Sequence, residues 1–151
     1  MASSSPTRDG GHLTTSATET STPGQAAGQE EAIKKVVNDY YVGLRDGDLV
    51  SLGKAFNDLA VVCGYIETEL FEKHVKTLYD YVLAEEPPSK KGDPFTCDIE
   101  SIAFAGKTAV VTLAEHDYLG YDYSTSLHLI CDADGWSIVS KLFNGTPTTG
   151  K

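Results

Sequence analysis

Four strand-like runs joined by very short turns fill the C-terminal part of this chain, and they constrain its fold more than any other feature. The turns are Ala105-Gly106, Leu119-Gly120 and residues 132–135. Connections this short join strands that lie antiparallel beside one another. The sequence therefore predicts a four-stranded antiparallel meander, with strands at Phe95–Phe104, Thr108–Tyr118, Tyr121–Cys131 and Trp136–Phe143.

Helical periodicity precedes the meander. From Gln29 onwards, apolar residues recur at the spacing of one helix face, at Ile33, Val36, Val37, Tyr40, Tyr41 and Leu44. Gly47 is placed to cap the C-terminal end of this helix. Asp48 then predicts the N-cap of a short second helix that ends at Phe56.

A β-rich run over Leu59–Ile66 and a third helical pattern over Leu70–Leu83 complete the N-terminal part. Helices first and a meander second indicate an α+β fold, with three helices packed on a curved, mainly antiparallel sheet.

One folded domain accounts for residues 29–145. Residues 1–28 are mostly Ser, Thr, Gly, Pro and Ala, with hardly any large apolar side chain. Such a segment buries too little surface to offset the entropy lost on ordering, so we predict a disordered tail there. We also predict a disordered C-terminal end over residues 146–151.

The charge balance excludes several classes of function. The formal net charge is -10, with 22 acidic residues against 12 basic ones. A nucleic-acid binder must neutralise phosphates with Lys and Arg, and an anionic membrane surface attracts the same residues. We therefore expect neither partner. With no leader-like or membrane-spanning apolar run, we expect a cytoplasmic protein.

Metal and cofactor sites are not expected either. Cys63, Cys97 and Cys131 are evenly scattered, and no pair of them has the spacing of metal ligands. The chain also has no phosphate-binding glycine loop and no Ser/His/Asp arrangement.

Strand alternation assigns the meander residues to two faces. If Leu119-Gly120 is a two-residue turn, Glu115 lies opposite Ser124. One face then carries Val110, Thr112, Ala114, His116, Tyr118, Tyr121, Tyr123, Thr125, Leu127, Leu129, Ile138, Ser140, Leu142 and Asn144. The other carries Ala109, Val111, Leu113, Glu115, Ser126, His128, Val139, Lys141 and Phe143.

The first face mixes aliphatic residues with a few polar ones, which is the composition of a ligand cavity, although a plain core with tyrosine hydroxyls at its rim also fits. We expect the second face to be half exposed or to form a homodimer through the sheet.

Two sequence segments resemble a known superfamily. Arg45-Asp46-Gly47-Asp48, then Phe56-Asn57-Asp58 and Ala60-Val61-Val62, is similar to the opening of nuclear transport factor 2-like domains. The end of the chain, from Ser126-Leu127-His128-Leu129 through Gly135-Trp136 to Lys141-Leu142-Phe143, resembles the close of its lumazine-binding branch, which is related to polyketide cyclases. The resemblance covers about residues 30–144 and implies a cone-shaped, cystatin-like fold.

The resemblance also implies site residues. Tyr40 falls where ketosteroid isomerases of this superfamily place an oxyanion-stabilising tyrosine, whereas Gly64 falls where they place their catalytic carboxylate. Four further positions of the lumazine-binding branch are neutral here, at Asn57, Thr125, Ser140 and Asn144.

We therefore predict Tyr40 and His116 as catalytic residues and Tyr65, Tyr123, Thr125 and Asn144 as substrate-binding residues. The first hypothesis is a cofactor-independent cyclase, isomerase or dehydratase that acts on a hydrophobic, polyketide-like or polycyclic molecule. The alternative is a non-catalytic module for small-molecule binding or dimerisation.

Overall fold

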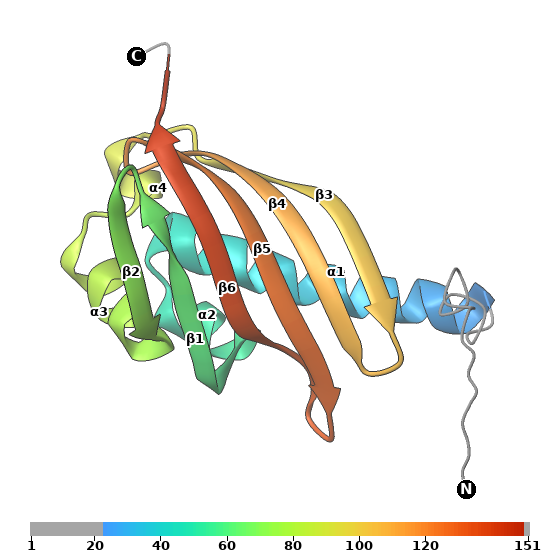
Figure 1. Cartoon of the computed structure of the whole chain (residues 1–151). Helices are drawn as coiled ribbons and strands as arrows, with labels where there is room; N and C mark the ends of the chain where they lie inside the picture. Colours follow the sequence, from blue (N-terminus) through green and yellow to red (C-terminus); the bar gives the residue numbers. More distant parts are fainter. Residues whose placement is uncertain (1–22, 150–151) are drawn as a thin grey trace, which may run out of the picture.

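The computed structural model describes residues 23–149, which form a curved six-stranded sheet with helices on one side (Figure 1). The strand order is β2-β1-β6-β5-β4-β3. β1 and β6 run parallel, and every other neighbouring pair runs antiparallel. The predicted α+β class and the mainly antiparallel sheet are confirmed.

The predicted elements occur in the predicted order, with changes at several ends, and the structure adds two elements that were not predicted, β2 and α4. The helices are α1 (Pro23–Asp46), α2 (Leu49–Ala55), α3 (Val75–Ala84) and the short α4 (Pro88–Lys91). The strands are β1 (Phe56–Ile66), β2 (Glu69–His74), β3 (Thr96–Ala105), β4 (Thr108–Tyr118), β5 (Tyr121–Asp132) and β6 (Gly135–Pro147). None of the helices in the described range is long and apolar enough to cross a membrane.

Two elements extend beyond the ends predicted for the domain. α1 begins at Pro23 rather than Gln29, and β6 continues to Pro147, beyond the predicted end at residue 145. Most of the predicted N-terminal tail, residues 1–22, lies outside the described residues, as do residues 150–151.

The predicted third helix is wrong over its first turn. Glu69–His74 is the edge strand β2, which pairs antiparallel with β1, so that Phe71 lies opposite Gly64. The helix begins only at Val75, where the His74 side chain accepts a hydrogen bond from the backbone N–H of Lys76. The turn between β1 and β2 needs a left-handed residue, and Glu67 adopts that conformation (φ 56°) without a glycine to signal it.

α1 lies along the sheet and buries the side chains that its periodicity predicts. Tyr40 and Ile33 are fully buried, and Leu44 is 2% exposed. We call the sheet face beneath the helices the inner face. Its buried side chains from the central strands include Ala60, Val62, Ala109, Val111, Leu113, Glu115, Tyr118, Thr125, Leu127, Leu129, Ile138, Lys141 and Phe143.

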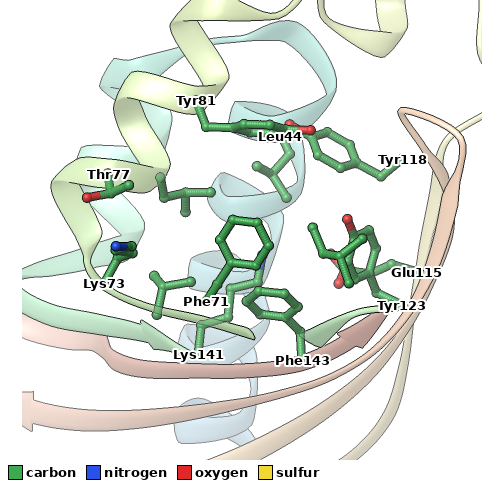
Figure 2. A pocket seen from close by; sticks show the side chains of 13 residues that line it. Leu44, Phe71, Lys73, Thr77, Tyr81, Glu115, Tyr118, Tyr123, Lys141 and Phe143 are labelled. Carbon is green, nitrogen blue, oxygen red and sulfur yellow. The ribbon is translucent and has the colours of Figure 1, made fainter. Parts of the chain in front are cut away.

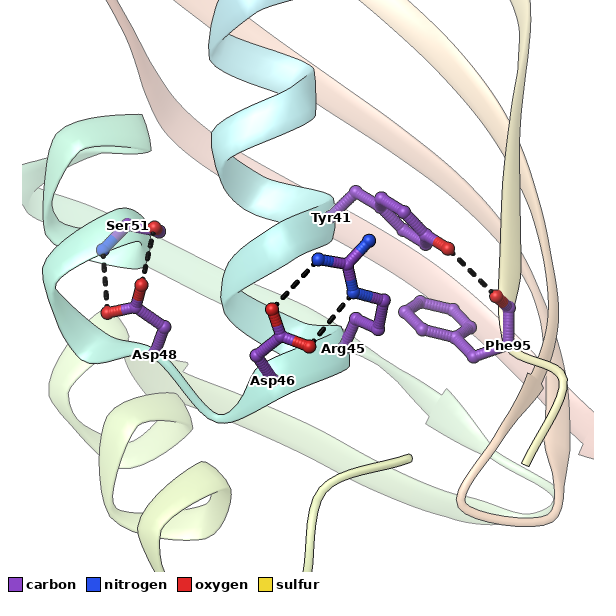
Figure 3. Close-up of polar contacts among 6 residues, drawn as sticks. All are labelled: Tyr41, Arg45, Asp46, Asp48, Ser51 and Phe95. Atoms are coloured by element: carbon purple, nitrogen blue, oxygen red, sulfur yellow. Dashed lines mark hydrogen bonds and ion pairs between the residues drawn. The ribbon is translucent and has the colours of Figure 1, made fainter. Parts of the chain in front are cut away.

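The Arg45-Asp46-Gly47-Asp48 segment turns the chain from α1 into α2 (Figure 3). Gly47 takes the left-handed conformation (φ 67°) that favours glycine, and the N–H of Asp48 donates to the carbonyl of Gly43. The Asp48 carboxylate accepts from the backbone N–H of Val50 and from the Ser51 hydroxyl, so the predicted N-cap is confirmed.

Candidate functional site

An apolar cavity of about 130 Å3 lies between the helices and the inner face of the sheet (Figure 2). Its lining comes from α1, α3 and five strands: Leu44, Val62, Ile66, Phe71, Lys73, Thr77, Leu78, Tyr81, Glu115, Tyr118, Tyr123, Lys141 and Phe143. Lys73, Thr77 and Tyr81 are exposed, so they mark the side on which the cavity meets solvent. The lining also contains two buried charged residues, Glu115 and Lys141 (Figure 2).

Glu115 is held by two hydroxyl groups from different elements. It is 2% exposed, and the Tyr40 hydroxyl of α1 donates to its Oε2 at 2.7 Å. The Thr125 hydroxyl of β5 donates to its Oε1. Burial raises the pKa of Tyr40, and the neighbouring carboxylate of Glu115 raises it further, so Tyr40 keeps its proton and remains a donor. A carboxylate with both oxygens fixed in this way has a defined orientation towards the cavity.

Lys141 of β6 is the second buried charge. It is 8% exposed, and its Nζ lies 5.1 Å from the ring centroid of Tyr40 and 5.3 Å from that of Phe143. Both ring faces attract the ammonium group. Within the described part of the chain, this group makes no hydrogen bond and no ion pair, with Glu115 or with any other residue. Burial lowers the pKa of Lys141, while the nearby Glu115 and Cys97 act in the opposite direction.

Two β-bulges bring these charges to the inner face. In the β4–β5 pair, Tyr118 lies opposite Tyr121 as predicted, but Glu115 lies opposite Tyr123 instead of Ser124. The extra residue in β4 is accommodated at Asp117, which has a left-handed backbone (φ 62°) and donates its N–H to the Asp122 carboxylate.

The second bulge lies in β6. His128 of β5 lies opposite Ser140, and Leu129 lies opposite Ile138, so Val139 is the extra residue. Beyond this point the alternation of β6 is reversed, and Lys141 and Phe143 point inwards.

The predicted division of the meander into two faces is therefore wrong for much of β4 and β6. Residues expected on the cavity face, among them Val110, His116 and Leu142, lie on the outer face of the sheet, away from the helices. Residues expected on the opposite face, Glu115 and Lys141, line the cavity. A bulge shifts alternation by one residue, and the prediction assumed uninterrupted strands.

The structure brings together three of the six predicted site residues. Tyr123 lines the cavity, Thr125 and Tyr40 bind Glu115, and Tyr40 lies behind that carboxylate. His116 lies outside with its side chain 52% exposed, and its ring nitrogens are 3.9 Å from Asp98 and 3.8 Å from Asp122.

The other two predicted residues also lie on the outer face. Tyr65 and Asn144 are opposite one another on β1 and β6 and border an outer hollow of about 530 Å3, together with Leu70 and Leu142. The sheet therefore separates Tyr65 and Asn144, the two predicted substrate-binding residues on this face, from the inner cavity.

The side chains of the cavity offer proton transfer and hydrogen bonding. Among residues 23–149, no group of three or more His, Cys, Asp or Glu side chains could hold a metal ion. An acceptor-only carboxylate and a cationic donor face the same apolar space, and a carbonyl compound offers complementary groups to both.

A curved mixed sheet closed by helices around such a cavity defines the nuclear transport factor 2-like class of cystatin-like cones. The chain belongs to the family described as "Putative lumazine-binding", whose model matches residues 28–144. The resemblance identified in the sequence is thus confirmed. A comparison with curated proteins found no match.

Solved structures with the same fold carry different descriptions. An NTF2-like protein of unknown function from Shewanella baltica is 22% identical with a TM-score of 0.72, covering 85% of this chain and 99% of its own. The CaMKII hub of S. rosetta is 17% identical with a TM-score of 0.63, covering 76% of this chain and 95% of its own.

A third structure, described as a "putative ketosteroid isomerase" from Shewanella frigidimarina, is 20% identical with a TM-score of 0.56, covering 77% of this chain and 97% of its own. At these identities the similarity establishes the fold alone, because one fold hosts many functions.

Proposed function

We propose that this protein is a cofactor-independent enzyme of the isomerase type, which binds a small apolar carbonyl compound in the inner cavity. One observation supports this most strongly: Glu115 and Lys141 open onto the same apolar space without a direct ion pair between them. Two opposite charges in such a space attract each other across it, and a polar ligand group can lie between them. The family and the isomerase-like neighbour are consistent with this chemistry.

Each residue has a role in the proposed reaction. Lys141 donates a hydrogen bond to the carbonyl oxygen and stabilises the negative charge that develops there. Glu115 accepts a proton from the carbon next to the carbonyl and returns it at another position. Tyr40 and Thr125 hold the carboxylate in place and are positioning residues.

The size of the cavity limits the substrate. An internal cavity of about 150 Å3 holds a molecule the size of benzene, whereas sites for drug-sized ligands span about 300–1,000 Å3. With about 130 Å3, this cavity favours a compound with one ring over the polycyclic, polyketide-like molecule that the resemblance implies. Cyclisation and dehydration of a compound of that size use the same two groups and belong to the same proposal.

Deuterium exchange tests the proposal without knowledge of the natural substrate. Acetophenone carries one ring and an acidic methyl group beside its carbonyl, so loss of the methyl signal in D2O by proton NMR reports enolisation. We expect exchange above the solvent background, reduced about 100-fold or more in Glu115→Gln because a positioned base contributes about 10²–10⁴-fold. Lys141→Met should also lower the rate about 100-fold.

Matched controls carry the same chemical change on exposed side chains. Glu72→Gln and Lys76→Met alter residues of β2 and α3 outside the cavity and should leave exchange at the wild-type rate. Exchange at background in the wild type, or an unchanged rate in Glu115→Gln, contradicts the proposal.

A non-catalytic module that forms a homodimer is the second candidate, and the outer face of the sheet favours it. Val61, Tyr65, Leu70 and Leu142 are between 46% and 52% exposed on neighbouring strands. Exposed apolar patches of this kind mark protein interfaces. The dimer surface proposed here therefore differs from the one that the sequence predicted, which turned out to contribute Glu115 and Lys141 to the cavity.

Light scattering at micromolar concentration tests the dimer. We expect the mass of two chains for the wild type and of one chain for Leu142→Glu, because a charge in the centre of an apolar interface must lose its hydration. A wild-type monomer contradicts this candidate.

A further inference from the structure

Lys141 differs from the other lysines in its surroundings. Among the lysines that the structure describes, it is the buried one, whereas Lys34, Lys73, Lys107 and the rest are exposed. A solvated ammonium group keeps its proton at neutral pH and is a poor nucleophile, whereas a lysine in a hydrophobic pocket can be activated by desolvation. The position of Lys141 therefore allows a reaction that the surface lysines perform poorly.

The cavity also supplies what a condensation reaction needs. It is lined mostly by apolar side chains, which exclude competing water, and it is large enough for one ring beside Nζ. Nζ makes no hydrogen bond with any described residue, so no donor occupies its lone pair and no acceptor fixes its protons. Glu115 opens onto the same space and can carry a proton between the reacting groups.

We propose that Lys141 is a reactive amine that captures small aldehydes as an imine inside the cavity. This inference rests on the proposed function, since it uses the same cavity and the same carbonyl class, and it names aldehydes as ligands that bind covalently. It assigns Lys141 a nucleophilic role in addition to hydrogen bonding.

The reaction balances without an oxidant or reductant. The Nζ lone pair of the neutral amine forms a bond to the carbonyl carbon, and the carbonyl electron pair moves to oxygen. One proton passes from nitrogen to that oxygen, which gives a carbinolamine. The C–O bond then breaks, oxygen leaves as water with a proton delivered through Glu115, and nitrogen loses its remaining proton as the C=N bond forms.

The charged and titratable neighbours decide how much neutral amine is present. Burial lowers the pKa of Lys141 and favours the neutral form, while Glu115 of β4 and Cys97 of β3 favour the ammonium. From α1, Tyr40 faces Lys141 with its ring, and burial keeps its hydroxyl protonated. The remaining titratable groups around the cavity are Lys73, Tyr81, Tyr118 and Tyr123.

Reductive trapping on the whole protein tests the inference. The wild type is treated with benzaldehyde and sodium cyanoborohydride at neutral pH, and the benzylated lysines are located by peptide mass mapping. We expect Lys141 to be modified several-fold faster than any exposed lysine, because its burial favours the neutral amine and the cavity holds the aldehyde beside Nζ. Modification at exposed lysines, with Lys141 no faster than they are, overturns the inference.

Two further measurements separate this inference from the proposed function. Acetophenone competes for the cavity without readily forming a stable imine, so it should slow benzylation at Lys141 and leave Lys76 unaffected. Its binding, followed by ligand-detected NMR, tests the cavity alone. Binding of acetophenone without benzylation of Lys141 refutes the reactive amine and keeps the proposed function, whereas the absence of both refutes both.

Discussion

The coupling between Glu115 and Lys141 can be measured as stability, independently of any substrate. Removing one member of a buried pair of charges costs about 3–5 kcal/mol, because the other charge is left in a medium that solvates it poorly. Glu115→Gln leaves the Lys141 ammonium with two ring faces and no anion nearby, so we expect a loss of about 3 kcal/mol.

Lys141→Met should cost less. The Glu115 carboxylate keeps its hydrogen bonds from Tyr40 and Thr125, and bonds to a charged acceptor each contribute about 1.5–3 kcal/mol. Methionine also fills the apolar space left by the lysine stem. In the double variant neither charge remains, so stability should return to within about 1 kcal/mol of the wild type, as it does when a buried pair is replaced as a unit.

Urea unfolding at pH 7 gives the four free energies of unfolding that this cycle needs.

The pH dependence of the free energy of unfolding provides a second test. The folded-state pKa of Lys141 is lowered, so between that pKa and 10.5 the unfolded state binds more protons and stability rises with pH. Glu115 raises the pKa of Lys141, so in Glu115→Gln the increase of stability with pH should begin at a lower pH. In Lys141→Met the part of this increase that comes from Lys141 should be absent.

Additivity would refute the reasoning. If the double variant loses the sum of the two single losses to within about 0.5 kcal/mol, Glu115 and Lys141 do not share an electrostatic environment. The proposed reaction would then lose its main support.

Further predictions concern the scaffold. A Cβ on Gly64 would lie 2.1 Å from the carbonyl oxygen of Phe143, so Gly64→Ala should destabilise the fold by about 1–3 kcal/mol in urea unfolding. Gly53→Ala has open space in a helix and should stabilise by about 0.5–1 kcal/mol instead. Asp48→Ala removes the N-cap of α2 and should lower the melting temperature at pH 7. Hydrogen bonds from Ser51 lower the pKa of Asp48 in the folded state below 3.8. The stability that the Asp48 carboxylate contributes is therefore lost as pH falls below 3.8 and through this lowered pKa, and the difference in melting temperature between Asp48→Ala and the wild type should shrink there.

The sequence predicts most elements of the fold because local signals are strong there. The bounds of β4, Thr108–Tyr118, agree with the prediction, and the glycine and aspartate between α1 and α2 play the capping roles expected of them. The sequence of β2 favours a helix because Phe71 continues the helical spacing of the residues after it. The preceding turn also contains neither glycine nor asparagine to announce a hairpin.

The candidate site was harder to predict, although the sequence contains a signal for it. Val111 and Leu113 are the most apolar alternate positions of β4, and Leu127 and Leu129 are those of β5. With a two-residue turn at Leu119-Gly120, these two sets fall on opposite faces of the sheet, so one of them would point away from the hydrophobic core. A single extra residue resolves the conflict, so the clash between alternation and turn length predicts a bulge even where no glycine marks it.

The bulges explain why the charged pair is where it is. In uninterrupted strands joined by the same short turns, the face that carries Leu127 and Ile138 would carry His116 and Leu142, and Glu115 and Lys141 would lie outside. The bulge in β4 requires a left-handed Asp117, and the hydrogen bond to Asp122 offsets part of that cost. Two irregularities, each one residue long, thus place a carboxylate and an ammonium against an apolar cavity, where the buried pair adds little net stability. A pair of charges with so little effect on folding is better explained by a ligand that uses it than by the stability of the sheet.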